Sequence, residues 1–454
     1  MPDFTVCTAA ELVDLYQKGS ASPVTVTEQL LNKIDQLNPV LNAFCYLDPD
    51  TTLQQARNSE QRWQQHSPLS KLDGVPFAVK DSILTQGWPT LQGSLTVDPV
   101  QDWLEDAPVT ARLRAAGAIL IGKTTMPEFG VDNHSSNSQL YGITRNPWNT
   151  KHTPGGSSGG SAVAVAAGMV PVALGSDFGG SIAVPAAFCG VYGMKPSFGH
   201  VARYPSDTVD LTTIGPMARS VQDLTTALEV ISGPDVRDWA SLPDGRVDHN
   251  FSTNQLRVAY CQDSVTTSKI AQRLSDQGAM IGPVDFDVDI DEAMQIMKNI
   301  NIPELFQKWQ SIPEDRRPLT SNNIQRWVIL SHSKIDLYHW IDRRKKLIVK
   351  FREFMQHYDA IICPVTAMSA DEFLVDNMVS HKKDLFLSQF SVLACITKQP
   401  TVTVPTGLNS NSMPEAVQII GPMHGDALTL QIASAIESAF PMPAGPLLYG
   451  KSTQ

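Results

Sequence analysis

The sequence predicts an α/β protein, folded as one large domain over residues 1–454, with a central mixed, mostly parallel β-sheet covered by helices on both faces. Between Pro154 and Pro196 a Gly/Ser loop, an apolar helix, an apolar strand, a second Gly/Ser loop and a third apolar segment follow one another. Such a crossover unit connects strands of a parallel or mixed sheet. With 42% hydrophobic and 18% charged residues, the chain also has the material for a large core.

The first two expected elements are helices near the start of the chain. Thr8 and Glu11 have the capping-box spacing, in which each side chain satisfies a free N–H group, so a helix should run to about Gly19. Ser22 suits the cap of a second helix, in which apolar residues recur at helical spacing until Pro39 should end it.

The next two expected elements are strands. Residues 75–79 alternate as in a β-strand, and Lys80 follows at its end, while the apolar run at 115–121 is also typical of a strand. Lys80 is unusual because the end of a buried strand is a costly place for an ammonium group. The remaining expected elements are helices at 221–231, around 343–352 and at 427–440, and strands at 360–364 and 401–405.

The net charge excludes two classes of partner. Lys and Arg number 35 against 46 Asp and Glu, a net charge of −11, which a phosphate backbone or an anionic lipid surface would repel. The most apolar stretch, residues 162–174, is 13 residues long, whereas a membrane-spanning helix needs about 20. We expect no nucleic-acid or membrane partner, and the lack of a signal-like N-terminus favours the cytoplasm.

The cysteines indicate neither a metal site nor a disulfide framework. All six are separated by tens of residues, without a CxxC pair or a histidine at metal-ligand spacing. We therefore expect no metal and no cofactor.

Glycine is concentrated in two Gly/Ser loops, residues 155–161 and 175–181. Of 29 glycines, 11 lie between Gly155 and Gly199, and Asp177 is the only charged residue from Gly155 to Met194. Consecutive glycines allow several backbone N–H groups to converge on one oxygen, as in an anion site or an oxyanion hole. A phosphate-binding P-loop would need a lysine that neither loop contains.

A serine in such a loop needs a base before it can act as a nucleophile. His152 and His200 flank the loops, and no GxSxG nucleophile elbow is present, which weakens a Ser-His-Asp triad without eliminating it. The other available base is a lysine whose pKa is lowered by burial, and Lys80 meets that requirement.

The segment GGSSGGSAVAVAAGMVPVALGSDFGGSIAVPAAFCGVYGMKP at residues 155–196 closely resembles the signature segment of the amidase signature hydrolases. The resemblance extends to GVPFAVKD around Lys80, to RNPWN before the first loop, and to VQIIGPMHGDALTLQIASAIE near the end, so it covers about residues 9–439. The charged region at about 264–358 has no firm match and is expected to be a more variable, helical part of the same domain. Together with residues 199–211, it is expected to shape the acyl pocket.

The resemblance implies a Ser-cisSer-Lys triad. Ser181 matches the nucleophile, Ser157 the bridging serine that relays protons, and Lys80 the general base. Amide hydrolysis would proceed through an acyl-enzyme on Ser181, with some esterase activity. The oxyanion hole that the resemblance implies consists of the backbone N–H groups of Phe178, Gly179, Gly180 and Ser181.

One departure from the family concerns the substrate. Ala183 stands where many members have an arginine, which favours a small neutral amide over a carboxylate-bearing one, and Phe178 would add an aromatic wall to the site. Two alternatives remain: an amidotransferase-type subunit that works with partner chains, and a non-catalytic member that binds a ligand or partner. The resemblance also implies a homodimer.

Several neighbouring residues are expected to have structural roles. Ser158 and Ser161 should cap the helix after the first loop, and Ser176 and Asp177 should order the second loop. Lys80 could instead form an ion pair with the adjacent Asp81. A Cys-Glu-Lys site would pair Cys189 with Glu128, but the apolar surroundings of Cys189 predict a buried, inert thiol.

Overall fold

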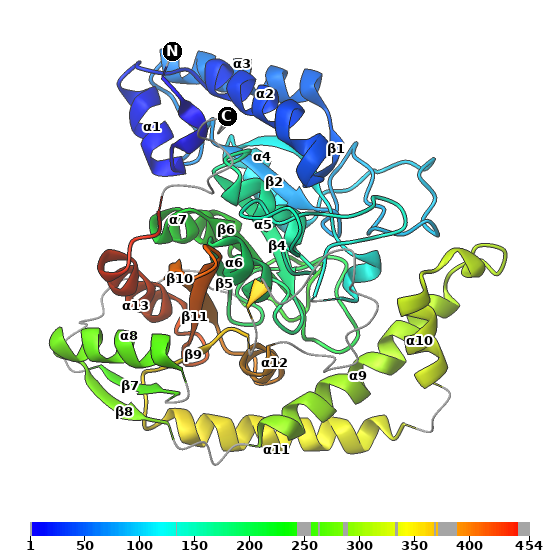
Figure 1. Cartoon of the computed structure of the whole chain (residues 1–454). Helices are drawn as coiled ribbons and strands as arrows, with labels where there is room; N and C mark the ends of the chain where they lie inside the picture. The colour runs from blue at the N-terminus through cyan, green and yellow to red at the C-terminus, as the bar shows by residue number, and fades with distance from the viewer. Residues whose placement is uncertain are drawn as a thin grey trace.

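The computed structural model describes residues 2–132, 134–242, 256–261, 264–284, 289–331, 335–366, 369–370 and 388–443. Its strands form one sheet in the order β1-β3-β2-β4-β6-β5-β10-β11-β9-β7-β8 (Figure 1). The strands are β1 (Phe44–Leu47), β2 (Pro76–Lys80), β3 (Ile119–Thr124), β4 (Val172–Asp177), β5 (Tyr192–Lys195), β6 (Thr213–Ala218), β7 (Arg257–Tyr260), β8 (Met280–Pro283), β9 (Ala360–Pro364), β10 (Thr401–Leu408) and β11 (Pro414–Ile420).

The sheet is mixed, as expected, but it is not mostly parallel. Of the ten neighbouring pairs among the described strands, six are antiparallel and four are parallel. The parallel pairs are β2 with β3 and β4, and β7 with β8 and β9. Consecutive strands such as β5 and β6, or β10 and β11, pair directly and antiparallel, an arrangement that needs no crossover helix.

Helices cover both faces of this sheet. They are α1 (Ala9–Gln17), α2 (Pro23–Leu41), α3 (Pro49–Gln64), α4 (Pro108–Ala115), α5 (Gly159–Ala166), α6 (Ala183–Cys189), α7 (Val221–Ile231), α8 (Val265–Asp276), α9 (Ile290–Gln310), α10 (Asn322–Leu330), α11 (Leu337–Met355), α12 (Gln389–Ile396) and α13 (Asp426–Ala439). Phe77 and Val79 of β2 pack into one apolar cluster with α4, α7 and α13. Ala78, between them, faces a second cluster with α2, α5 and α6, because successive strand side chains point to opposite faces.

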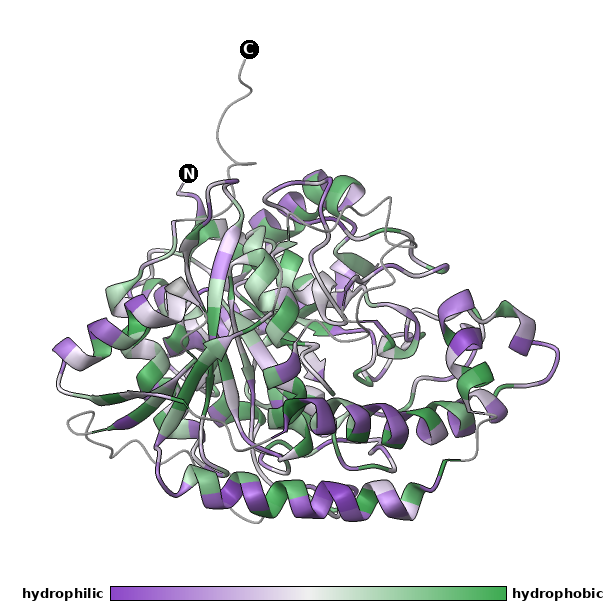
Figure 2. Cartoon of the chain, turned by 60° about the horizontal axis from the view of Figure 1, so that its bottom comes forward, coloured by the Kyte–Doolittle hydropathy of each residue, from purple (hydrophilic) through white to green (hydrophobic). Residues whose placement is uncertain are grey.

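Helices α9, α11 and α12 pack on a third cluster, against β9 and β11. In Figure 1 α9 and α11 lie along the lower edge of the molecule, and α10 lies beyond α9. Figure 2 brings these helices forward and shows hydrophilic and hydrophobic residues mixed along them, as in helices with one solvated face. No helix in the described ranges has both the length and the apolar character to span a membrane.

Most of the expected elements form, although the ends of some are shifted. The capping box of Thr8 and Glu11 is present, and α7 spans the expected residues. Helix α2 does not end at Pro39, because proline removes only its own N–H bond and the Asn42 N–H still donates to the Asn38 carbonyl at 2.8 Å. Strand β10 likewise continues three residues beyond Pro405, to Leu408.

The strand expected at residues 115–121 lies later in the chain. Ala115 is the last residue of α4, and Gly117, with a φ of +81°, turns the chain into β3. Lys123 therefore lies inside β3 and beside β2, where it pairs in register with Val79. The neighbouring strands β2 and β3 thus each carry a completely buried lysine, Lys80 and Lys123.

Candidate active site

Lys80 is the last residue of β2, a strand with parallel neighbours on both sides. Its side chain is completely buried, and its Nζ donates to the hydroxyl oxygens of Ser157 at 2.6 Å, Ser158 at 2.9 Å and Ser176 at 3.0 Å. The contacts come from both Gly/Ser loops. The end of β2 therefore brings a lysine amine to the point where the two loops meet.

The environment of Lys80 favours its neutral form. Burial lowers its pKa from 10.5 to about 7, against an opposing effect of the Asp177 charge. The alternative ion pair with Asp81 does not form: the Asp81 carboxylate accepts from the Tyr141 hydroxyl at 2.8 Å and from the Gly93 N–H at 3.1 Å. Lys80 is thus left facing hydroxyl groups rather than a carboxylate.

The first loop presents Ser157 to Lys80 through a cis Gly156–Ser157 peptide bond. A side chain at Gly156 would be impossible here, because its Cβ would lie 1.9 Å from the Ser135 carbonyl oxygen. The loop is tied to the second one by the Ser158 N–H, which donates to the Ser181 carbonyl at 3.0 Å.

The expectation that Ser158 and Ser161 cap α5 is wrong. Neither side chain donates or accepts at the helix start; the Gly159 N–H donates instead to Ser136 Oγ at 2.8 Å. Ser158 is drawn to the Lys80 amine, and Ser161 Oγ donates to the Leu174 carbonyl of β4 at 2.9 Å. Both hydroxyls therefore bind groups of the neighbouring strands, Ser158 the Lys80 amine of β2 and Ser161 a carbonyl of β4.

Asp177 orders the second loop, as expected. Its Oδ1 accepts from the N–H groups of Gly179 at 3.0 Å and Gly180 at 2.7 Å, and its Oδ2 accepts from the Ile182 N–H at 2.6 Å. One carboxylate therefore bends the chain around the position of Ser181 and satisfies the first amides of α6. Ser176 has a further contact that the sequence did not predict, since its hydroxyl accepts from Lys80.

These bonds change which amides can act as an oxyanion hole. Gly179 and Gly180, two of the four expected donors, already donate to Asp177. Within the described part of the chain, the N–H groups of Phe178 and Ser181 have no acceptor. These two amides are the ones left for a developing oxyanion.

Ser157 and Ser181 both line a cavity of about 1170 Å³, a size suited to a small-molecule ligand. Both side chains are largely buried, with residue exposures of 3% and 8%. Phe178 also lines the cavity, so the expected aromatic wall is present.

The rest of the cavity wall comes from outside the two Gly/Ser loops. It includes the 203–208 loop, the turn at Phe129, and the α9 and α10 residues Leu305, Lys308 and Trp327. The stretches 199–211 and 264–358 were expected to shape this pocket, whereas the turn at Phe129 was not.

Neither alternative nucleophile system is assembled. Cys189, the last residue of α6, is buried in the apolar cluster that α6 shares with α5, and burial raises the pKa of its thiol. Glu128 is held instead by the Ser94 hydroxyl at 2.6 Å and the Ser321 N–H at 2.7 Å. His152 and His200 do not line the cavity. Ala183, in place of the common arginine, packs in an apolar cluster.

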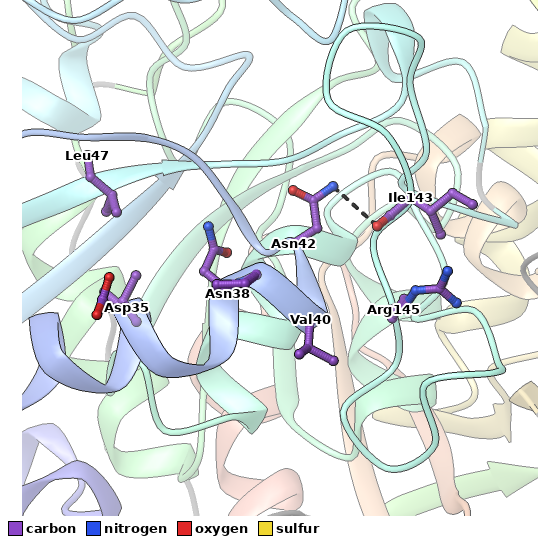
Figure 3. Close-up of a pocket in the computed structure, with 9 residues that line it drawn as sticks. Asp35, Asn38, Val40, Asn42, Leu47, Ile143 and Arg145 are labelled. Carbon is purple, nitrogen blue, oxygen red and sulfur yellow. Dashed lines mark hydrogen bonds between the residues drawn. The ribbon is translucent and has the colours of Figure 1, made fainter.

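A second, more open hollow of about 570 Å³ lies at the end of α2. Figure 3 shows Asp35 and Asn38 on one side and Arg145 on the other, with Asn42 donating to the Ile143 carbonyl at 3.2 Å. None of the site residues expected from the sequence lines it.

The loops, the buried lysine and the cavity together define an α/β protein with a serine-lysine site. A family model described as Amidase matches residues 25–430. The chain therefore belongs to the amidase family, in agreement with the resemblance of its signature segment.

The chain is similar to two named groups within this family. It is 32% identical to the A subunit of the glutamyl-tRNA(Gln) amidotransferase of Chloroflexus aurantiacus, over 92% of this chain and 93% of the relative. A crystal structure of the same subunit from Thermotoga maritima superposes with a TM-score of 0.83, at 27% identity over 99% of each chain. A bacterial aryl acylamidase of the amidase signature family superposes with a TM-score of 0.86, at 25% identity over 96% of each chain.

Proposed function

We propose that this chain cleaves carboxylic amide bonds through an acyl-enzyme on Ser181, with Lys80 as general base and Ser157 as proton relay. The observation that carries the proposal is the 2.6 Å contact between the buried Lys80 amine and the Ser157 hydroxyl, at a cavity that Ser181 also lines. A pKa of about 7 leaves much of the amine neutral near pH 7 and able to accept a proton.

In the first half of the reaction, Lys80 accepts the Ser157 hydroxyl proton while Ser157 accepts the proton of Ser181. The Ser181 oxygen attacks the amide carbonyl, and the N–H groups of Phe178 and Ser181 stabilise the oxyanion. The relay then runs in reverse: the proton returns through Ser157 to the leaving nitrogen, the C–N bond breaks, and an amine departs.

In the second half of the reaction, water attacks the Ser181 ester. Lys80 and Ser157 take the water proton and return one to the Ser181 oxygen as the acyl-enzyme bond breaks. The products are a carboxylic acid and the regenerated enzyme. The same cycle would cleave an ester, because both substrates form the same acyl-enzyme.

A second candidate is the amide-cleaving subunit of an amidotransferase that works with partner chains. The observation that favours it is the 32% identity to a glutamyl-tRNA(Gln) amidotransferase chain over nearly the whole of both sequences. Ala183, in place of the arginine that many family members have, argues against a substrate identical to that of the amidotransferase. The two candidates share the Ser181 chemistry. They differ in whether the chain cleaves amides without partner chains.

The chemistry is tested by labelling the purified chain with a fluorophosphonate probe. We expect labelling of the wild type and of the control Ser434→Ala, on the outer side of α13, and none of Ser181→Ala. Labelling that persists in Ser181→Ala would reject the nucleophile. A folded chain that labels nowhere and cleaves no amide would instead be the non-catalytic ligand-binding member.

The two candidates are separated by assaying p-nitroanilides with the chain alone. Turnover by the isolated chain supports the stand-alone amidase. The second candidate is supported if the isolated chain is labelled by the probe but does not turn over the anilide, and if adding amidotransferase partner chains restores turnover.

A further inference from the structure

Lys308 places a positive charge in the wall of the same cavity. It lies near the end of α9 and lines the cavity together with Ser157 and Ser181. Its Nζ donates to Gln92 Oε1 at 2.7 Å and lies 4.3 Å from the centre of the Phe129 ring. A hydrogen bond and a cation–π contact thus hold the ammonium in one place.

The nearby acidic residues each have a partner other than Lys308, although Glu304 Oε2 is buried without one. Asp207 pairs with Arg203 at 3.0 Å, and Glu304, one helical turn before Lys308, accepts from the Thr208 N–H at 3.2 Å. Glu128 accepts from two other partners, as described above. Within the described ranges no carboxylate lies within 4.0 Å of Lys308.

The charge of Lys308 is therefore fixed in position but not neutralised by a contact. Burial lowers its pKa to about 8, which leaves most of the group protonated at pH 7. An ammonium has three N–H donors, of which Gln92 takes one. A charged donor that is partly removed from water binds an anion more tightly than a neutral group of the same shape.

We infer that Lys308 binds a carboxylate on the substrate, at a distance from the amide that Ser181 attacks. This inference rests on the proposed amide cleavage and reverses the expectation of a neutral substrate drawn from Ala183. The cation comes from α9 rather than from α6, where Ala183 is enclosed in an apolar cluster. Arg326 of α10 also lines the cavity, as do the carboxylates of Asp207 and Glu304.

The test compares two acyl anilides of equal chain length, glutaryl-p-nitroanilide, which carries a carboxylate, and valeryl-p-nitroanilide, which does not. We expect Lys308→Met to lower kcat/KM for the glutaryl substrate by about tenfold or more, since one charged contact is worth about 1.4 kcal/mol. The value for the valeryl substrate should change by less than about twofold. Lys308→Arg should keep most of the preference.

Two further variants separate charge from packing. Lys298→Met, on the same helix but outside the cavity lining, is the matched control and should leave both substrates unaffected. Glu304→Gln removes a neighbouring negative charge and should improve the glutaryl substrate severalfold. An equal loss for both substrates in Lys308→Met would assign Lys308 a purely structural role and overturn the inference.

A binding measurement keeps this test independent of turnover. In the Ser181→Ala background, calorimetry should find that Lys308→Met weakens glutaryl-p-nitroanilide binding and leaves valeryl-p-nitroanilide binding unchanged. Equal binding of the two anilides to the Ser181→Ala chain would refute the carboxylate site even where the amide chemistry holds. Failure of the amide chemistry shows itself separately, as loss of fluorophosphonate labelling.

Discussion

The thiol of Cys395 donates to Asp177 Oδ1 at 3.3 Å, the same oxygen that accepts from Gly179 and Gly180. Cys395 lies on α12, on the same face as Ser391. Ser388, the residue just before this helix, donates its hydroxyl to the Gly179 carbonyl at 3.0 Å. A helix from the C-terminal part of the chain therefore holds the loop that presents Ser181.

The first prediction concerns Asp177. In Asp177→Asn one carboxylate oxygen becomes an NH₂ group, which cannot accept from the backbone N–H groups it would face. The loop should lose its shape, and kcat should fall by about a hundredfold, the usual scale for a disturbed oxyanion hole. Steady-state kinetics and the rate of fluorophosphonate labelling measure the effect. A variant with unchanged kcat and an intact fold would show that the loop does not depend on this carboxylate.

The second prediction concerns Cys395. Cys395→Ala removes one of several hydrogen bonds to Asp177, and Cys395→Ser restores a donor at the same place. We expect a loss of a few-fold in kcat for alanine, since one neutral hydrogen bond contributes about 1 kcal/mol, and a recovery for serine. KM should stay constant in both, because Cys395 is buried away from the cavity. A change in KM alone would contradict a role through the loop.

The third prediction is a pH profile. Only neutral Lys80 can accept a proton, so kcat/KM for a neutral anilide should rise with pH through about 7 and level off at higher pH. Below the pKa the rate should fall about tenfold per pH unit. The neutral substrate keeps the titration of Lys308 out of the profile. A rise centred near 10.5, the ordinary lysine value, would show that burial does not perturb Lys80.

The sequence was most informative where function depends on local chain order. Ser157 and Ser181 follow from the Gly/Ser pattern and the family resemblance, and Lys80 from its place after an apolar strand. The directions in which side chains point were predicted less well. The position of Ser158 predicts a helix cap, but its hydroxyl binds the buried Lys80 amine, which is a stronger partner than a backbone amide.

The same limit applies to contacts over long sequence distances. Asp177 was expected to order its loop, but which amides it would occupy depends on the bend of the chain after β4. Lys308 lies far along the chain from Ser181, and no local pattern links an α9 lysine to the cavity. The balance of parallel and antiparallel strands was misjudged for a related reason, because the crossover unit at 154–196 describes only part of the sheet.

The fourth prediction separates Ser181 from Cys189. Cys189→Ala should keep kcat within about twofold of the wild type, because the thiol is buried in an apolar cluster and its raised pKa keeps it protonated. Glu128→Gln should retain probe labelling at Ser181. Loss of labelling in Cys189→Ala, in a chain that still folds, would revive the cysteine as the nucleophile.

The last prediction is that Lys80 destabilises the fold at neutral pH. Its pKa is about 7 in the folded chain and near 10.5 when unfolded, so the unfolded chain binds more protons between these values. The contribution of Lys80 to stability therefore rises with pH across this window and is least favourable at and below pH 7. Lys80→Met should be inactive, but its free energy of unfolding at pH 7 should exceed that of the wild type by on the order of a few kcal/mol. The loss of the hydrogen bonds to the serines reduces this gain. Urea unfolding of both proteins at pH 7, 8 and 9 measures the difference, which should shrink as pH rises. A difference independent of pH would mean that Lys80 titrates alike in both states, and the neutral base proposed for Ser157 would lose its physical support.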